Sequence, residues 1–242
     1  MGYGGTVSMG NAVNTERIYI NDTDLADYGA KALRDSIKVG GTTITNDYFQ
    51  GRNRTYFTMM STTFGLKSVS FTLVYEDTSL RTAMEHRSRL EVEMFDGCEV
   101  YLNDGFYYRC MLDSIGEAEI KGVDGIQVLV QVSYKLMGIQ HDPLVTITDG
   151  SSFIAKGTMP KMDCRLSVTV GATAVSYTLG GAVFENVQAG DVLVFDGILK
   201  RFLKNGAPTT AKEWISFPYV IMGQNAFTAL DPVTVEFYPC YL

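Results

Sequence analysis

The sequence contains few of the residues on which enzymes and metal sites depend. Its 242 residues include only two histidines and four cysteines. No two cysteines have the Cys-x-x-Cys spacing of zinc or redox sites, and no Gly-x-Ser-x-Gly nucleophile motif occurs. We therefore expect a protein that is not an enzyme, with no catalytic residue, no cofactor and no metal site.

Long apolar runs and clustered basic residues are scarce as well. No segment approaches the roughly 20 apolar residues of a membrane span, and residues 1–20 lack the basic start and apolar run of a signal peptide. The net charge is −7, and the Lys and Arg residues are dispersed. Because nucleic-acid binding requires clustered basic residues, we expect no specific nucleic-acid binding. The scarcity of apolar runs leads us to expect no membrane span and synthesis in a reducing cytoplasm.

The cysteines and histidines have ordinary structural explanations. Scattered cysteines are most often buried thiols that pack as small apolar groups, although a bridge between Cys98 and Cys110 across a hairpin is the alternative. His86 is expected on the surface of a helix and His141 in a linker, both in solvated or capping roles.

The main sequence period is two, which is typical of half-buried strands. Apolar side chains alternate with polar ones in residues 68–75, 126–136 and 233–238. Glycine-containing turns at 103–105, 180–181 and 205–206 separate further short strands. Strands about every ten residues with such turns favour a sandwich or an open barrel.

One helix is predicted after the first of these strands. Asp77 is expected as its N-cap, and the helix is expected to end before Met94. Its buried face is expected to consist of Leu80, Ala83, Met84, Arg87 and Leu90.

Two domains are expected from a change in composition at residues 138–160, where glycine, serine, threonine and proline gather. The first, residues 1–140, is α+β with an antiparallel sheet and one helix. The second, residues 141–242, is a β-sandwich. The chain as a whole is mainly β.

Two residue clusters could carry chemistry, and each has a simpler interpretation. Glu91, Glu93, Asp96 and Glu99 could include a glycosidase pair, but a solvated edge after the helix is favoured. Trp214 with its aromatic neighbours could stack on a sugar, but a core or interface cluster is favoured.

The segment 50–64, QGRNRTYFTMMSTTF, combines arginine, aromatic and methionine residues with little charge balance. These residue types are enriched in protein–protein interfaces. The alternative is a β-hairpin arm with ordinary packing, and the sequence leaves the two interpretations even.

The order of segments resembles the distal tail proteins (Dit) of siphophage-type tails. The resemblance rests on the closing segment 191–242, with its "FP" step, "GxN" turn and last aromatic strand. Earlier segments follow the same order: RIYINDTDLADYG, SVSFTLVYE, TSLRTAMEHRSRL, EVYLNDGFYYRCML and IQVLVQVSYKLMGIQHDPL. The "GR" of residues 51–52 retains only part of a turn that is frequent in that family.

The resemblance implies a structural component of a phage or phage-like tail tip. The N-terminal domain would form a ring, typically a hexamer, that connects the tail tube to the baseplate, and the C-terminal domain would be a galectin-like β-sandwich. The implied partners are other copies of the chain, the tail tube protein, a tail-associated or baseplate hub protein and a receptor-binding protein. The implied location is the virion tail tip, and no cofactor is implied.

A ring would cover sheet edges, which otherwise tend to associate. We expect the subunit contact to involve the N-terminal strand and the 50–64 hairpin, and deletion of 50–64 to abolish the ring. The candidate contact residues are Ile18, Ile20, Arg52, Arg54, Tyr56 and Phe57. The main alternative is a carbohydrate-binding module that attaches to host cell-surface glycans, and a glycan-cleaving enzyme that uses the 91–99 acids is the third hypothesis.

Overall fold

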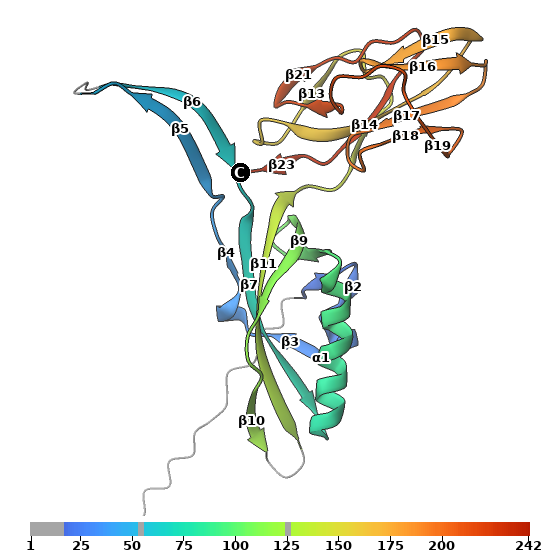
Figure 1. Cartoon of the computed structure of the whole chain (residues 1–242). Helices are drawn as coiled ribbons and strands as arrows, with labels where there is room; N and C mark the ends of the chain where they lie inside the picture. The colour runs from blue at the N-terminus through green and yellow to red at the C-terminus, as the bar shows by residue number, and fades with distance from the viewer. Residues whose placement is uncertain (1–16, 53–55, 124–126) are drawn as a thin grey trace, which may run out of the picture. The chain divides into compact units, whose positions relative to one another are not determined.

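The computed structural model describes residues 17–52, 56–123 and 127–242, without the side chains of 121–123. The chain divides into two compact units, Met1–Gly138 and Ile139–Leu242 (Figure 1). It is mainly β, and the described residues contain one α-helix, in the first unit, as the sequence predicts. Each unit has its own buried core, and each is described separately.

The first unit contains one long antiparallel sheet, one α-helix and a separate hairpin. Its strands are β1 (Tyr19–Ile20), β2 (Thr23–Asp24), β3 (Ala30–Ala32), β4 (Lys38–Val39), β5 (Ile44–Gln50), β6 (Phe57–Phe64), β7 (Lys67–Asp77), β8 (Cys98–Tyr101), β9 (Tyr107–Ile115), β10 (Glu119–Val123) and β11 (Val128–His141), which continues into the second unit. Its helices are α1 (Leu80–Phe95) and two 3-10 turns, η1 (Leu25–Tyr28) and η2 (Arg34–Ser36).

The sheet of the first unit has the strand order β2-β1-β8-β9-β11-β7-β3, with β4 on β7 and β10 on β11. The two longest strands pair from Val128↔Asp77 to Gly138↔Lys67. Helix α1 lies along one face of this sheet (Figure 1). The inward side chains are those that the period of two predicts: Val69, Phe71, Leu73, Tyr75, Val130, Val132, Tyr134 and Leu136.

Helix α1 begins two residues later than predicted. Its N-cap is Ser79, whose Oγ accepts a hydrogen bond from the backbone N–H of Thr82 at 3.1 Å. The predicted cap, Asp77, is the last residue of β7 and accepts from the N–H of Thr78 at 2.6 Å. The side chain of Asp77 is therefore used by the strand-to-helix turn, and the next hydroxyl caps the helix.

The buried face of α1 also differs from the prediction. Ala83, Leu90 and Met94 are fully buried, whereas Leu80 and Met84 are exposed. The helix continues to Phe95 instead of ending before Met94, and Gly97, with φ 93°, follows its end. The two additional helical residues include Met94, which is in the core, whereas Leu80 and Met84 near the start are not.

The cap gives a direct test of this helix start. We expect Ser79→Ala to lower the free energy of unfolding by about 1 kcal/mol, because the Thr82 N–H loses its acceptor. Ser88→Ala, at an exposed position within the same helix, is the control and should cause no loss. Urea unfolding measures both values. Equal effects of the two substitutions would contradict the assignment of Ser79 as the cap.

The second unit is built from short antiparallel strands. They are β12 (Val145–Ile147), β13 (Phe153–Ala155), β14 (Met162–Thr169), β15 (Ala174–Leu179), β16 (Ala182–Val187), β17 (Val192–Asp196), β18 (Arg201–Lys204), β19 (Ala207–Thr209), β20 (Tyr219–Val220), β21 (Gly223–Asn225), β22 (Thr234–Phe237) and β23 (Cys240–Tyr241).

These strands form a sandwich-like arrangement around one core. The main sheet has the order β12-β22-β14-β17-β18-β19, with β20 on the end of β14. The hairpin β15–β16 packs closely on this sheet. Its turn residue Gly180 lies so near Leu166 of β14 that an added side chain would collide with it. The predicted turns are present: Gly180 and Gly181 have φ of 56° and 90°, and Asn205 and Gly206 have φ of 52° and 78°. Within the described ranges, no helix is long and apolar enough to cross a membrane.

Candidate subunit-contact surface

The candidate surface is the hairpin of β5 and β6, which forms a two-stranded sheet of its own. Its strands pair from Ile44↔Phe64 to Gln50↔Phe57, with a bulge on β6 opposite the Asp47–Tyr48 step. The hairpin continues outward beyond β4 and β7 (Figure 1). An isolated two-stranded hairpin is at best marginally stable in water, so the pairing of β5 with β6 supplies little stability by itself.

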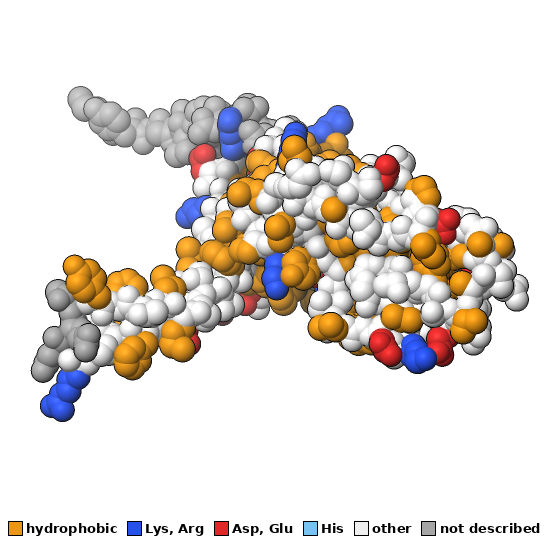
Figure 2. Space-filling view, turned by 90° about the horizontal axis from the view of Figure 1, so that it is seen from above, with side chains coloured by type: hydrophobic (Ala, Val, Ile, Leu, Met, Phe, Trp, Pro, Cys, Tyr) orange, Lys and Arg blue, Asp and Glu red, His pale blue; other side chains and the backbone are white. Residues whose placement is uncertain are grey.

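Large apolar side chains on the hairpin face the solvent. Figure 2 shows hydrophobic side chains along the arm that ends at the small grey group. Those that are more than half exposed are Ile44, Tyr48, Phe49, Tyr56, Phe57, Met59 and Met60. Contiguous apolar exposure of this kind marks an interaction surface. The segment forms the β-hairpin arm of the alternative interpretation, and in the single chain the large apolar side chains of that arm are exposed.

The two faces of the hairpin differ in character. Alternation along β5 and the register with β6 place Ile44, Tyr48, Phe57 and Met59 on one face. The opposite face carries Phe49 among threonine and serine residues. We call the first face the apolar hairpin face.

A hollow of about 330 Å³ lies on the apolar hairpin face. It is lined by Asn46, Tyr48, Gln50, Phe57 and Met59. The rings of Tyr48 and Phe57 meet edge to face with centroids 5.7 Å apart, and Thr62 Oγ1 donates to Asn46 Oδ1 at 3.0 Å. The hollow can therefore accept an apolar side chain, with amide groups at its rim.

The predicted contact residues fall into three groups. Arg52, Tyr56 and Phe57 are exposed at the outer end of the hairpin. Arg54 lies outside the described residues. The side chains of Ile18 and Ile20 are 1% and 0% exposed and belong to the core of the first unit. These two isoleucines offer no side-chain surface to a neighbouring copy, so our proposal does not include them.

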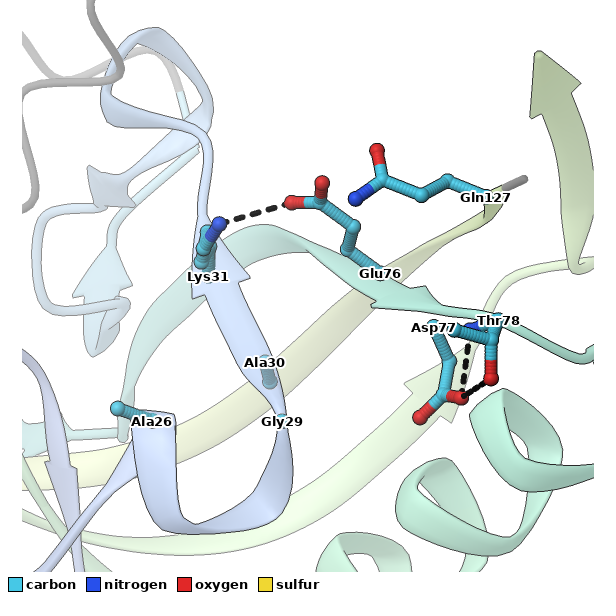
Figure 3. A pocket seen from close by; sticks show the side chains of 8 residues that line it. All are labelled: Ala26, Gly29, Ala30, Lys31, Glu76, Asp77, Thr78 and Gln127. Carbon is cyan, nitrogen blue, oxygen red and sulfur yellow. Dashed lines mark hydrogen bonds and ion pairs between the residues drawn. The ribbon is translucent and has the colours of Figure 1, made fainter. Parts of the chain in front are cut away.

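A second hollow, of about 430 Å³, lies in the first unit between η1 and the end of β7. Figure 3 shows Lys31 and Glu76 facing each other across it, with Nζ and Oε2 2.8 Å apart. The carboxylate of Asp77 is turned toward its own Thr78. Lys31 and Glu76 therefore pair with each other, and the Asp77 carboxylate is hydrogen-bonded to Thr78. Among the residues that the structure describes, no group of His, Cys, Asp or Glu side chains is placed to hold a metal ion.

The predicted solvated acidic edge after the helix is wrong for Glu91, and Glu93, although exposed as predicted, also lies within α1. Glu91 lies within α1, with its side chain 13% exposed, and its Oε1 accepts from Arg87 Nε at 2.6 Å and from the Tyr134 hydroxyl at 3.1 Å. Tyr134 also shares a 2.9 Å hydrogen bond with Tyr75. Burial raises the pKa of both tyrosines. This network joins the helix to the sheet, and the Glu91 carboxylate already has two donors within it.

Both histidines are more enclosed than predicted. The His86 side chain is only 28% exposed, and its Nδ1 lies 3.6 Å from Asp77 Oδ2. His141 is buried, with Nδ1 2.8 Å from the Asp142 carbonyl oxygen and its ring edge-on to Tyr238. Packing against neighbouring segments, which the local sequence does not reveal, encloses both rings.

The cysteines largely follow the prediction of buried thiols. All four are free, and Cys98, Cys110 and Cys164 are buried, while Cys240 is half-buried. Cys98 and Cys110 are direct partners across β8 and β9. Burial raises the pKa of Cys98 to about 11 and of Cys110 to about 12, so neither is a reactive thiolate at neutral pH.

Trp214 belongs to an aromatic cluster of the second unit, the favoured interpretation of the sequence. Its ring lies 5.6 Å from that of Phe202 and 4.8 Å from that of Phe217. Phe195 stacks on Phe202 at 4.9 Å. Part of the indole surface is thus covered by the rings of Phe202 and Phe217.

Sequence reasoning missed a row of tyrosines on the first unit's sheet. Tyr19 pairs with Tyr101, and Tyr101 with Tyr107, on adjacent strands β1, β8 and β9. Their ring centroids are 6.1 and 5.0 Å apart. The predicted turn at 103–105 could have indicated the pairing of Tyr101 with Tyr107, whereas Tyr19 is brought to Tyr101 only by the long-range pairing of β1 with β8.

Comparison with known proteins identifies the fold. No family model matches the sequence, and the search of curated proteins gave no match. Among solved structures, the chain has a fold similar to those of a phage hub protein and of phage baseplate chains. It is similar to the Dit protein of phage SPP1, described as a paradigm of the hub adsorption apparatus in phages that infect Gram-positive bacteria. The TM-score is 0.66 at 12% identity, over 93% of this chain and 99% of that one.

Two further similar structures are chains of the phage p2 baseplate in its activated conformation. With strontium, the TM-score is 0.52 at 11% identity, over 92% of this chain and 97% of that one. With calcium, it is 0.50 at 11% identity, over 89% and 92%. At these identities the similarity establishes the fold, which is the one implied by the sequence resemblance.

Proposed function

We propose that this protein is a structural component of a phage or phage-like tail tip. The observation that carries the proposal is a similarity of fold that extends over nearly the whole of this chain and of SPP1 Dit. Both units are included in that similarity, so the proposal does not depend on one common β module. The proposed location is the virion tail tip.

In this role the first unit assembles into a ring, taken as a hexamer, that connects the tail tube to the baseplate. The exposed apolar hairpin supports assembly, because a free two-stranded ribbon with unpaired edges tends to associate. The proposed partners are other copies of the chain, the tail tube protein, a baseplate hub protein and a receptor-binding protein. The second unit, residues 139–242, is proposed as the galectin-like projection of the ring.

A structural role is also favoured over a catalytic one. The most enclosed carboxylate of the predicted acidic cluster, Glu91, is already bound by Arg87 and Tyr134. Trp214 packs on Phe202 and Phe217, which leaves less of the indole for a sugar ring. We therefore propose neither the hydrolase nor the carbohydrate-binding function.

Negative-stain electron microscopy with light scattering on the same purified sample tests the proposal. We expect ring-shaped particles whose mass is a small multiple of 26.7 kDa. Addition of the tail tube protein from the same genome should increase ring stability or stack the rings. Monomers at every concentration, with or without that protein, would contradict the ring.

A further inference from the structure

The C-terminal end of helix α1 has an unusual combination of charge and exposure. Val92 and Phe95 are about 60% exposed, and the side chains of Glu93 and Asp96 are exposed beside them. The last turn contains no basic residue. We call Val92, Glu93, Phe95 and Asp96 the helix shoulder.

Carboxylates at this position are unfavourable in the isolated chain. The C-terminus of a helix carries partial negative charge, so cations stabilise it and anions do not. Glu91 is neutralised by Arg87, but among the described residues neither Glu93 nor Asp96 has an ion-pair partner. Arg89, the nearest cation along the helix, lies over the ring of Tyr28 at 6.0 Å. A cation from outside the chain would therefore relieve this end of the helix.

The hairpin has the complementary chemistry. Its apolar face holds the 330 Å³ hollow between Tyr48, Phe57 and Met59, and exposed Arg52 lies at its outer end. Phe95 supplies an exposed ring for the hollow, and Glu93 and Asp96 supply partners for the guanidinium. Apolar contact and charge pairing thus occur together on both surfaces.

We propose that the apolar hairpin face of one copy docks on the helix shoulder of the next copy. The inference rests on the proposed ring and specifies the contact that closes it. Two different patches of the same chain meet, so the contact is heterologous, and repetition of such a contact generates a ring when the rotation closes. The hollow faces solvent in the single chain, and a neighbour fills it.

The tyrosine row is the other surface of the first unit on which the hairpin could dock. The charged residues around the row make it a poorer match for Arg52 than the helix shoulder is. Around the row, Arg109 already pairs with Glu99 at 3.7 Å, and Arg17 lies 3.9 Å from Asp24. Of the described carboxylates near the row, Glu99 and Asp24 therefore already lie beside an arginine. The charge of Arg52 is therefore better matched by Glu93 and Asp96.

Charge reversal in the full-length chain tests the contact. We expect Arg52→Glu, and separately Glu93→Lys with Asp96→Lys, to raise the concentration at which the chain assembles by about tenfold or more. Combining all three substitutions should restore assembly, because the pairing is then reversed and not lost. Asp27→Lys with Glu117→Lys is the control for the Glu93→Lys/Asp96→Lys variant. It makes the same change in net charge at exposed sites outside the shoulder and should assemble as the wild type does.

A mixing experiment separates this inference from the proposed function. A chain without the hairpin retains only the helix shoulder. The Glu93→Lys/Asp96→Lys chain retains only the apolar hairpin face as a functional contact surface. Native mass spectrometry of the mixture should show a one-to-one dimer and nothing larger. If the wild type forms rings and the shoulder variant assembles normally, the helix-shoulder contact is wrong and the ring stands. If the wild type never assembles, the ring and this contact are both wrong.

Discussion

Replacing residues 44–64 with an Asn-Gly turn is expected to abolish ring formation and to leave both units folded. The replacement removes the whole hairpin, including every side chain of its apolar face. The chain can close at this point, because the N–H of Gly65 already donates to the Thr43 carbonyl at 2.7 Å. The removed residues that the structure describes, 44–52 and 56–64, contribute nothing to the buried core of the first unit.

Light scattering should show monomers of the replaced chain at concentrations where the wild type forms rings. Circular dichroism and thermal unfolding on the same samples should show retained β structure. This replacement is a cleaner variant than the deletion of 50–64 suggested by the sequence. That deletion would remove β6 and leave β5 unpaired. Rings of normal mass from the replaced chain would show that the hairpin is not the subunit contact.

The strands were predictable because burial of one sheet face imposes a period of two on the sequence. Strands β7, β11 and β22 have the predicted inward side chains, with Val128 partly buried, while Ile126 of the predicted face lies outside the described residues. The turn at Asn103–Gly105 was equally readable, since Asn103 and Gly105 have φ of 60° and 90°. These signals are local, and the backbone geometry that produces them is local as well.

The helix boundary was less predictable because two neighbouring residues compete for one role. Asp77 and Ser79 are both good caps by type. Asp77 pairs with Val128 as the last residue of β7 in the long ladder, and the first helical residue is Leu80, so Ser79 is the residue in the cap position. The outcome depends on a strand more than 40 residues away and is not encoded in the segment itself.

The candidate surface was half predictable for the same reason. The composition of 50–64 suggested a contact segment as one of two even interpretations, but which of its side chains share a face depends on the bulge opposite Asp47 and Tyr48. The burial of Ile18 and Ile20, proposed as contact residues, follows from the pairing of β1 with β8, Ile20 opposite Val100. Long-range pairing decides which apolar residues stay outside.

Helix α1 contains two ion pairs with the same spacing and very different burial. Arg87 and Glu91 are 18% and 13% exposed, with Nε and Oε1 2.6 Å apart. Arg81 and Glu85 are 89% and 59% exposed, with the same atoms 2.9 Å apart. The two pairs therefore allow burial to be varied while helix, residue types and spacing stay fixed.

We expect Arg87→Met to lower the free energy of unfolding by about 2–4 kcal/mol, because it leaves the enclosed Glu91 carboxylate with the Tyr134 hydroxyl as its remaining donor. Arg81→Met should cost less than about 0.5 kcal/mol, since water solvates Glu85. Urea unfolding gives both values. The double variant Arg87→Met/Glu91→Met should recover much of the loss, because no uncompensated charge is then enclosed. Equal costs for the two single variants would show that Glu91 is solvated and that the network does not join the helix to the sheet.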